Sequence, residues 1–168
     1  MKPQKVRFLV WLIATLTVFG VSGKCLAQSQ KQAQESTGQD RTVVLANKVT
    51  QEYIDRLANV VKANCAANQK EDVAAAISTI HPKSAAYAST EQISKQLFAA
   101  LDLNYTMTGF HFIGRDDTYA VARVKIRTSK RAGNIEFQDN TADFMITFRQ
   151  DGNDWKVWSQ NILEILPD

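Results

Sequence analysis

Two histidines and one carboxylate near the end of the chain are the side chains of this sequence best suited to acid–base chemistry. His81 and His111 are the only histidines in 168 residues, and a zinc site usually takes three or four ligands from His, Cys or carboxylate side chains at short spacings. The sequence has no such spacing, so we expect neither a metal nor another cofactor. His81 stands directly before Pro82, where we expect it to satisfy carbonyls at the end of a helix.

His111 is the first candidate base, because an imidazole changes its charge near neutral pH. It lies in an alternating segment, in which successive side chains of a strand point to opposite faces. Tyr105, Met107 and His111 fall on one face, and Phe110 and Phe112 fall on the other and are expected to face the core. His111 is therefore predicted on the outer face of a sheet, with a position in a pocket as the alternative.

Asp143 is the second candidate base. It shares a strand face with Thr141 and Met145, opposite Phe144 and Phe148. If the phenylalanines pack on the helices, Asp143 points away from any cavity and is a solvated strand residue. A β-bulge that shifts the register by one residue would instead turn Asp143 into the cavity.

The last alternating segment offers polar groups for a binding pocket. We predict that Trp155, Val157, Ser159 and Asn161 face inward, which places the two polar side chains, Ser159 and Asn161, in an otherwise apolar cavity. Buried polar groups need a partner or a ligand, and hydrogen bonds to neighbouring strands would also satisfy them. Trp158 is predicted on the outer face, where an exposed aromatic side chain often marks a protein interface.

A group of cations lies on an earlier alternating segment. Arg123, Lys125 and Arg127 recur at two-residue steps, so they share one strand face, and two further cations follow at the hairpin. This cluster could hold an acidic partner or an anionic ligand, and the alternative is an exposed face that charge keeps soluble. We assign Arg123 and Lys125 to the same candidate interface as Trp158.

Three amphipathic helices are predicted before these strands. Residues 43–67 carry apolar side chains at three- and four-residue steps and contain neither Gly nor Pro. The spacing of Asn68 and Glu71 is that of a capping box, and it predicts a second helix that ends at His81. Ser89 and Gln92 have the same spacing and predict the start of a third helix.

After Asp102 the apolar period changes from helical to two. Turn sequences GRDD, SKRAGN and QDGND separate four alternating segments, residues 105–114, 118–128, 137–149 and 155–165. The Asp-Gly pair in the last turn predicts a tight hairpin. Helices first and antiparallel strands afterwards indicate an α+β domain, with helices covering one face of a curved sheet.

Residues 1–27 are predicted to be a secretory signal peptide. Cations precede an uncharged apolar run from Phe8 to Val21, which is shorter than the roughly 20 residues that a bilayer span needs. We expect cleavage after Ala27; Cys25 lacks the flanking residues of a lipid-attachment motif, and an uncleaved anchor is a further alternative. Residues 28–41 are rich in Gln and Ser and predict a disordered linker, which leaves residues 42–168 as one domain.

Removal of the signal peptide changes the charge of the chain. The whole sequence has 20 Lys and Arg against 17 Asp and Glu, and four of these cations and no acid lie in residues 1–27. The mature chain then has a net charge near −1, which argues against nucleic-acid binding. Cys65 is its one thiol, so no internal disulfide can form, and we expect a buried side chain there rather than a nucleophile.

The segments ANCAANQKEDVAAAISTIHP and FQDNTADFMITFRQDGNDWKVWSQNILEI resemble the nuclear transport factor 2-like superfamily, the cone-shaped fold shared by ketosteroid isomerases and SnoaL-like cyclases. The resemblance covers nearly the whole mature domain, and its most telling pieces are Asp72, which opens the second helix, and the DG-x-x-W-K-V strand opening at Asp151. It implies three N-terminal helices packed on a curved antiparallel β-sheet. This fold hosts enzymes, binding modules and assembly domains.

The resemblance also bears on single residues. Ketosteroid isomerases place a proton-donating tyrosine eight residues before the acid that matches Asp72, and this chain has Asn64 there. Their general base follows the second helix, where this chain has no carboxylate but has Tyr87, and their oxyanion-hole acid lies on a late strand near Asp143. We count Asn64 and Tyr87 with the candidate pocket residues.

These features favour an exported binding protein, periplasmic or extracellular, over an enzyme. We expect a cone that binds a small apolar or amphipathic ligand or a protein partner in the cell envelope, and that forms a homodimer, as related cones commonly do through the sheet. No stable membrane span is expected after cleavage. The alternatives are an isomerase, dehydratase or cyclase that uses His111 or Asp143 as a base, and an oligomerisation or interaction module.

Overall fold

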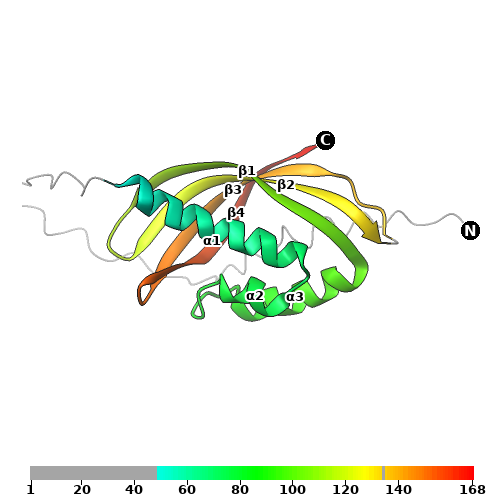
Figure 1. Cartoon of the computed structure of the whole chain (residues 1–168), viewed down its shortest axis with the longest axis horizontal. Coiled ribbons are helices and arrows are strands. Elements are labelled where there is room, and N and C mark those ends of the chain that lie inside the picture. The colour runs from blue at the N-terminus through cyan, green and yellow to red at the C-terminus, as the bar shows by residue number, and fades with distance from the viewer. Residues whose placement is uncertain (1–48, 134) are drawn as a thin grey trace, which may run out of the picture.

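Three helices are followed by four strands in a computed structural model, which describes residues 49–133 and 135–168 (Figure 1). The elements are listed in chain order: α1 (Gln51–Gln69), α2 (Val73–Ser78), α3 (Tyr87–Ala100), β1 (Leu101–Arg115), β2 (Tyr119–Gly133), β3 (Asn140–Asp151) and β4 (Asp154–Pro167). This order confirms the predicted α+β architecture. The predicted signal peptide, the predicted linker and the first residues of the predicted first helix lie outside the described residues.

Helix α1 supplies the apolar surface that covers the sheet. Its first turn is capped by Thr50, whose hydroxyl accepts a hydrogen bond from the Tyr53 amide at 3.2 Å. Leu57, Val61 and Cys65 follow at four-residue steps and are buried. The helix therefore turns one stripe of apolar side chains toward the strands, as its sequence period predicted.

The second helix opens at Asp72, as the resemblance implied, and not at Asn68, as the capping-box spacing predicted, and the third helix begins before Ser89. The chain reverses at Glu71, which has a positive φ of 57°, and the Asp72 carboxylate then caps α2 by accepting from the Ala75 amide at 2.9 Å. Asn68, the predicted cap, still belongs to α1. Helix α3 starts two residues before the predicted cap, Ser89, whose hydroxyl donates to the Ala86 carbonyl at 3.1 Å.

The four strands form one antiparallel sheet in the order β1-β2-β3-β4. Figure 1 shows this sheet curving over α1, with α2 and α3 on the same side. The β3–β4 hairpin turns at Gly152 and Asn153, between the paired residues Asp151 and Asp154, and Gly152 has the positive φ, 62°, that so short a turn favours in glycine. The predicted Asp-Gly turn is therefore present.

The hydrophobic core lies between α1 and the sheet. Leu57 of α1 and Phe148 of β3 are fully buried in it, and Val124 of β2 and Val157 of β4 belong to the same cluster. Burying one such side chain stabilises the fold by about 1.5–3 kcal/mol. One cluster therefore holds a helix and several strands together.

A β-bulge in β1 changes the face that its residues share. The register moves from Met107 paired with Ile126 to Gly109 paired with Lys125, so Thr108 is an extra residue. Tyr105 and Met107 therefore pack against the core on the same face as Phe110 and Phe112. This differs from the predicted grouping of Tyr105 and Met107 with His111, which strict alternation along the strand implied.

A second bulge changes the inner face of β4. Phe148 pairs with Val157, but Thr147 pairs with Ser159, so Trp158 is the extra residue. Residues opposite each other in a sheet share a face. Ser159 therefore shares the outer face with Thr147, whereas Trp155 and Val157 are buried in the core.

Candidate functional site

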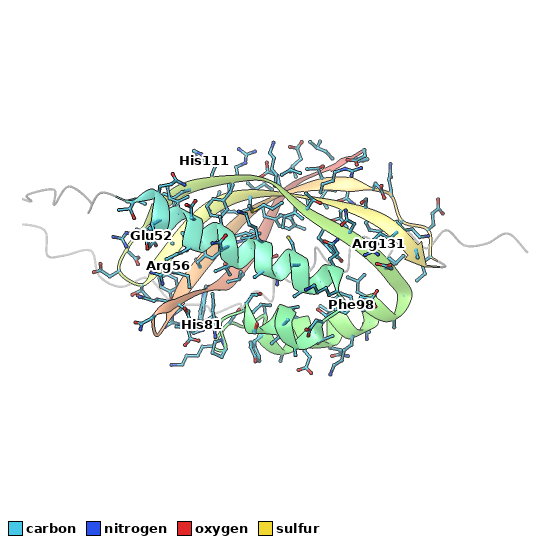
Figure 2. All side chains as sticks on the ribbon, in the orientation of Figure 1. Glu52, Arg56, His81, Phe98, His111 and Arg131 are labelled. Atoms are coloured by element: carbon cyan, nitrogen blue, oxygen red, sulfur yellow. The ribbon has the colours of Figure 1, made fainter. Side chains whose placement is uncertain are left out.

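The outer face of the sheet carries most of the predicted site residues. His111 pairs with Arg123, which pairs with Met145, which pairs with Asn161, and these four residues form one row across the sheet. In Figure 2 His111 lies on the side of the sheet that faces away from the helices. The next row contains Lys125, Asp143 and Glu164, so charges of opposite sign lie next to each other.

Asp143 points to this outer face, yet it is buried rather than solvated. Its side chain is 5% exposed and accepts from Arg123 through both oxygens, with Nη2 to Oδ2 at 2.7 Å and Nε to Oδ1 at 3.0 Å. The Lys125 ammonium lies 3.9 Å from Oδ2. The hydrogen bonds from Arg123 lower the pKa of Asp143, so this carboxylate is a weaker base than an ordinary aspartate.

Trp158 lies at the bulge and is half-buried by its neighbours. The Arg149 guanidinium stacks on its indole at 4.5 Å, and the rings of His81 and Tyr119 meet it edge-on, with centroids at 5.2 and 6.0 Å. His81 is buried, and its amide donates to the Val157 carbonyl at 2.9 Å. Trp158 therefore joins the edge of β4 to the segment after α2 and presents less free surface than predicted.

The predicted pocket residues do not meet in one cavity. The Asn64 side-chain amide donates to the Thr79 hydroxyl at 2.8 Å and to the Ala76 carbonyl at 3.3 Å, which ties α1 to α2. Tyr87 is the half-buried first residue of α3. Ser159 and Asn161 lie on the outer face, because the bulge at Trp158 shifts the register by one residue. This differs from their predicted inward position.

Apolar side chains are exposed at the far end of β4. Leu163 is 49% exposed, Leu166 49% and Ile165 38%, and one further large apolar residue of the described chain, Ile113 at 51%, is as exposed as these. Strand β4 is an edge strand. Its first half is covered by Thr79–His81, through two hydrogen bonds of 2.9 Å to Val157. No strand of the described residues pairs with the free edge of the second half.

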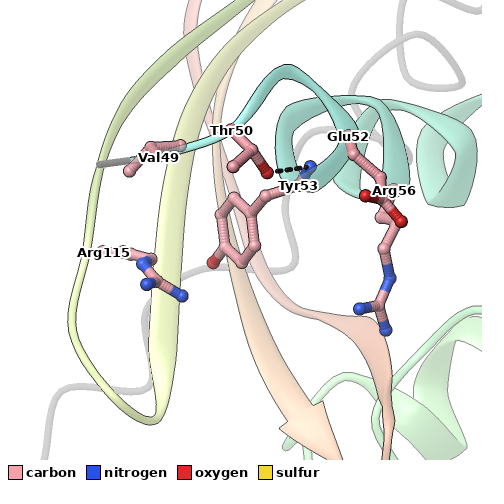
Figure 3. A pocket seen from close by; sticks show the side chains of 6 residues that line it. All are labelled: Val49, Thr50, Glu52, Tyr53, Arg56 and Arg115. Atoms are coloured by element: carbon pink, nitrogen blue, oxygen red, sulfur yellow. Dashed lines mark hydrogen bonds between the residues drawn. The ribbon is translucent and has the colours of Figure 1, made fainter. Parts of the chain in front are cut away.

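A hollow of about 260 Å³ lies at the N-terminal end of α1 (Figure 3). The Arg115 guanidinium stacks over the Tyr53 ring at 4.6 Å, and Figure 3 shows Arg56 on the other side of that ring. Burial raises the pKa of Tyr53, and the nearby Arg115 guanidinium opposes this rise. Six residues line the hollow: Val49, Thr50, Glu52, Tyr53, Arg56 and Arg115.

The sequence did not predict this hollow. Arg115 ends β1, and Tyr53 and Arg56 lie in the first turns of α1, so only the folded chain brings them together. The four-residue spacing from Glu52 to Arg56 is common on exposed helix faces and marks no site by itself.

Cys65 packs in the core, and burial raises the pKa of its thiol to about 11. A thiol with so high a pKa is protonated at neutral pH and is a poor nucleophile. Within residues 49–133 and 135–168 no three His, Cys, Asp or Glu side chains are placed to hold a metal ion. None of the described helices has both the length and the apolar character needed to cross a membrane.

Solved structures confirm the fold family. A protein of unknown function with a cystatin-like fold from Nostoc punctiforme superposes with a TM-score of 0.57 at 12% identity, over 67% of this chain and 91% of that chain. An NTF2-like protein of unknown function from Pseudomonas putida superposes with a TM-score of 0.54 at 12% identity, over 67% of this chain and 87% of that chain. A ketosteroid isomerase-like protein from Erwinia carotovora atroseptica superposes with a TM-score of 0.50 at 12% identity, over 68% of this chain and 99% of that chain.

These similarities define the class of protein: the chain has the nuclear transport factor 2-like fold. Residues 59–167, more than half of the chain, match the family described as "Anti-sigma-I factor RsgI9, C-terminal domain". The chain belongs to this family. A search of curated proteins found no match.

Proposed function

We propose that this protein is an exported, non-enzymatic binding domain that acts through protein contacts, with a second copy of the chain as its first partner. The observation that carries the proposal is the group of exposed apolar side chains at the far end of β4, Leu163, Ile165 and Leu166. Exposed apolar groups of this kind on an edge strand favour association with another chain. We call these three residues the β4 patch.

The charges beside the β4 patch suit a second copy. Strand β2 presents Arg123, Lys125 and Arg127 on the outer face, and their side chains are 46–52% exposed. Glu164 of β4 lies on the same face, opposite Asp143. In a two-fold contact each copy uses the same surface. Such a contact can place the cations of β2 against Glu164 of the other copy.

Two features support binding over catalysis. His111 and Asp143 both lie on the outer face, away from the space between helices and sheet, and Arg123 already holds the Asp143 carboxylate. At the centre of the cone, Leu57 and Phe148 are fully buried, which leaves little room there for a small apolar ligand. The name of the matching family describes a domain of an anti-sigma factor, which also supports a binding role.

Sedimentation velocity of the mature chain over a range of concentrations tests the proposal. We expect a reversible monomer–dimer equilibrium that Leu166→Asp and Glu164→Lys weaken, because they place a charge in the β4 patch or reverse one beside it. Lys125→Glu should weaken the dimer as well, and the double variant with Glu164→Lys should restore it. Glu91→Lys is the matched control, because Glu91 lies on α3 and pairs with Lys95.

Three results would overturn the proposal. A chain that stays monomeric at every concentration has no second copy as its partner, and a dimer that Glu164→Lys and Glu91→Lys weaken equally does not use this end of β4. Turnover of a ketosteroid that His111→Ala or Asp143→Asn abolishes would favour the enzymatic alternative instead.

A further inference from the structure

The hollow at the start of α1 has two guanidinium groups that no carboxylate of the described residues neutralises. Among the described residues, Arg123, Arg127 and Arg131 each form an ion pair with an aspartate, whereas neither Arg56 nor Arg115 has a carboxylate within 4.0 Å. Both line the hollow. A guanidinium without a carboxylate partner can still offer several of its five N–H donors to an incoming oxyanion.

The nearby carboxylates are engaged elsewhere or lie at the rim. Asp116 accepts from the amides of Thr118 and Tyr119, both at 2.7 Å, and Asp55 accepts from the Gln51 side chain at 2.9 Å. Glu52 lines the hollow and is exposed. The lining therefore carries two positive charges and one negative charge.

Each arginine is also held in place by a second contact. Arg115 stacks on the Tyr53 ring at 4.6 Å, and this ring is fixed in turn by edge-on contacts with Phe112 and Trp155, with centroids at 5.9 and 5.6 Å. Arg56 donates to the Asn153 carbonyl in the β3–β4 turn. Side chains that are already ordered lose less entropy when a ligand binds.

The Tyr53 hydroxyl adds an unsatisfied polar group beneath Arg115. It is buried, and it has no hydrogen-bond partner among the described residues. Figure 3 shows the hydroxyl directed toward the side of the ring where Arg115 lies. A buried hydroxyl without a partner carries a free-energy cost, which a small shift of Arg115 or an oxygen of a ligand could relieve.

We propose that this hollow, formed by Arg56 and Arg115 on either side of Tyr53, binds a small oxyanion group, a phosphate or a carboxylate. Planar guanidinium groups match both chemistries through paired hydrogen bonds. The volume of about 260 Å³ suits one such group better than a drug-sized molecule, whose pockets span roughly 300–1,000 Å³. The site lies apart from the β4 patch and goes beyond the proposed function.

NMR titration of the ¹⁵N-labelled mature chain with inorganic phosphate, and separately with acetate, tests the proposal while sodium chloride keeps the ionic strength constant. We expect saturable shifts of the amides of Thr50, Tyr53 and Arg115 with at least one of the two anions. The stronger anion identifies the ligand chemistry. Arg115→Gln and Arg56→Gln should each raise the Kd by about tenfold or more, which corresponds to ~1.4 kcal/mol.

Two further variants separate a built site from general attraction. Arg131→Gln removes the same charge at the opposite end of the sheet (Figure 2) and should leave the Kd unchanged. Arg115→Lys keeps the positive charge but loses the paired N–H donors of the guanidinium, so we expect a partial loss of affinity for the anion. Shifts that do not saturate, or a Kd that Arg131→Gln raises as much as Arg115→Gln does, would overturn the proposal. Arg56 and Arg115 are exposed, so these variants should fold.

Discussion

At the scale of single residues, Asp143 shows how a carboxylate can be buried on the outer face of a sheet. Its oxygens accept from Arg123, and Lys125 lies nearby, so cations on the neighbouring strand cover it. Arg123 itself is half-exposed. The desolvation cost of this pair is therefore smaller than that of a pair in the core.

We predict that Asp143→Asn lowers the free energy of unfolding at neutral pH by about 1–2 kcal/mol, because hydrogen bonds to a charged partner are lost and Arg123 is partly screened by solvent. Arg123 lowers the pKa of Asp143 in the folded protein. The stabilisation by Asp143 should therefore be complete above the ordinary carboxyl pKa of about 4, and should disappear as the pH falls through the lowered value. Urea unfolding at several pH values measures this difference.

Asp102→Asn is the control for Asp143→Asn. Asp102 forms a longer contact of 3.8 Å with Arg131, and both side chains are partly exposed, so its loss should change the free energy of unfolding by less than about 0.5 kcal/mol. A difference between wild type and Asp143→Asn that stays constant down to acid pH would contradict the role of the ionised carboxylate.

At the scale of elements, the corner between α3 and β1 depends on a glycine of another strand. Gly133 at the end of β2 pairs with Leu101 and has a φ of +115°, and a Cβ placed on it would lie 2.7 Å from the Ala100 carbonyl oxygen. A side chain at this position would have to displace the backbone where the helix becomes a strand. Glycine is the residue that allows this close approach.

We predict that Gly133→Ala lowers the free energy of unfolding by more than about 1 kcal/mol, because alanine is strained at this φ and its methyl group meets backbone. Gly114→Ala is the matched control, since a Cβ on Gly114 meets nothing within 4 Å and its φ is not positive. Thermal unfolding monitored by circular dichroism measures both variants. Equal losses for the two would show that the α3–β1 corner tolerates a side chain.

The elements themselves could be predicted from the sequence, whereas the faces of two strands could not. The change of period after Asp102 and the turn at Gly152 are local features, and both appear in the fold. The bulges at Thr108 and Trp158 are not local features of the sequence. Their positions are set by pairing with the neighbouring strand, and this pairing decides which face each following side chain occupies. The helix start at Asp72 depended on a reversal at Glu71, which the capping pattern does not contain.

The candidate sites show the same limit. The alternation within each strand favoured an exposed Arg123 and an outward Asp143, but it did not relate the two residues to each other. That Asp143 is buried beneath Arg123 depends on the β2–β3 register. The hollow joins residues of α1 with the end of β1, and no spacing in the sequence relates positions so far apart.

At the scale of the whole molecule, the proposed export would decide where the proposed binding surfaces operate. The whole chain has a formal net charge of +3, but the excess of cations lies in residues 1–27. Without residues 1–27, the Lys and Arg residues nearly equal the Asp and Glu residues in number. The exposed cations of β2 and the acids near them would then act as a local pattern on an almost neutral protein, which favours specific contacts over general attraction to polyanions.

We predict that the chain, produced with its own first 27 residues in an exporting bacterial host, is released with an intact mass that starts at Gln28. The charged start, the apolar run from Phe8 to Val21 and the small residue Ala27 provide the three parts that a signal peptidase requires. Ala27→Leu should reduce processing, because it places a bulky residue at the predicted cleavage position, and Ala33→Leu in the predicted linker should not. A full-length mass recovered from the membrane would show an uncleaved anchor, and a lipid mass on Cys25 would show lipid attachment; either result contradicts cleavage after Ala27 and would confine the β4 patch and the hollow to the membrane surface.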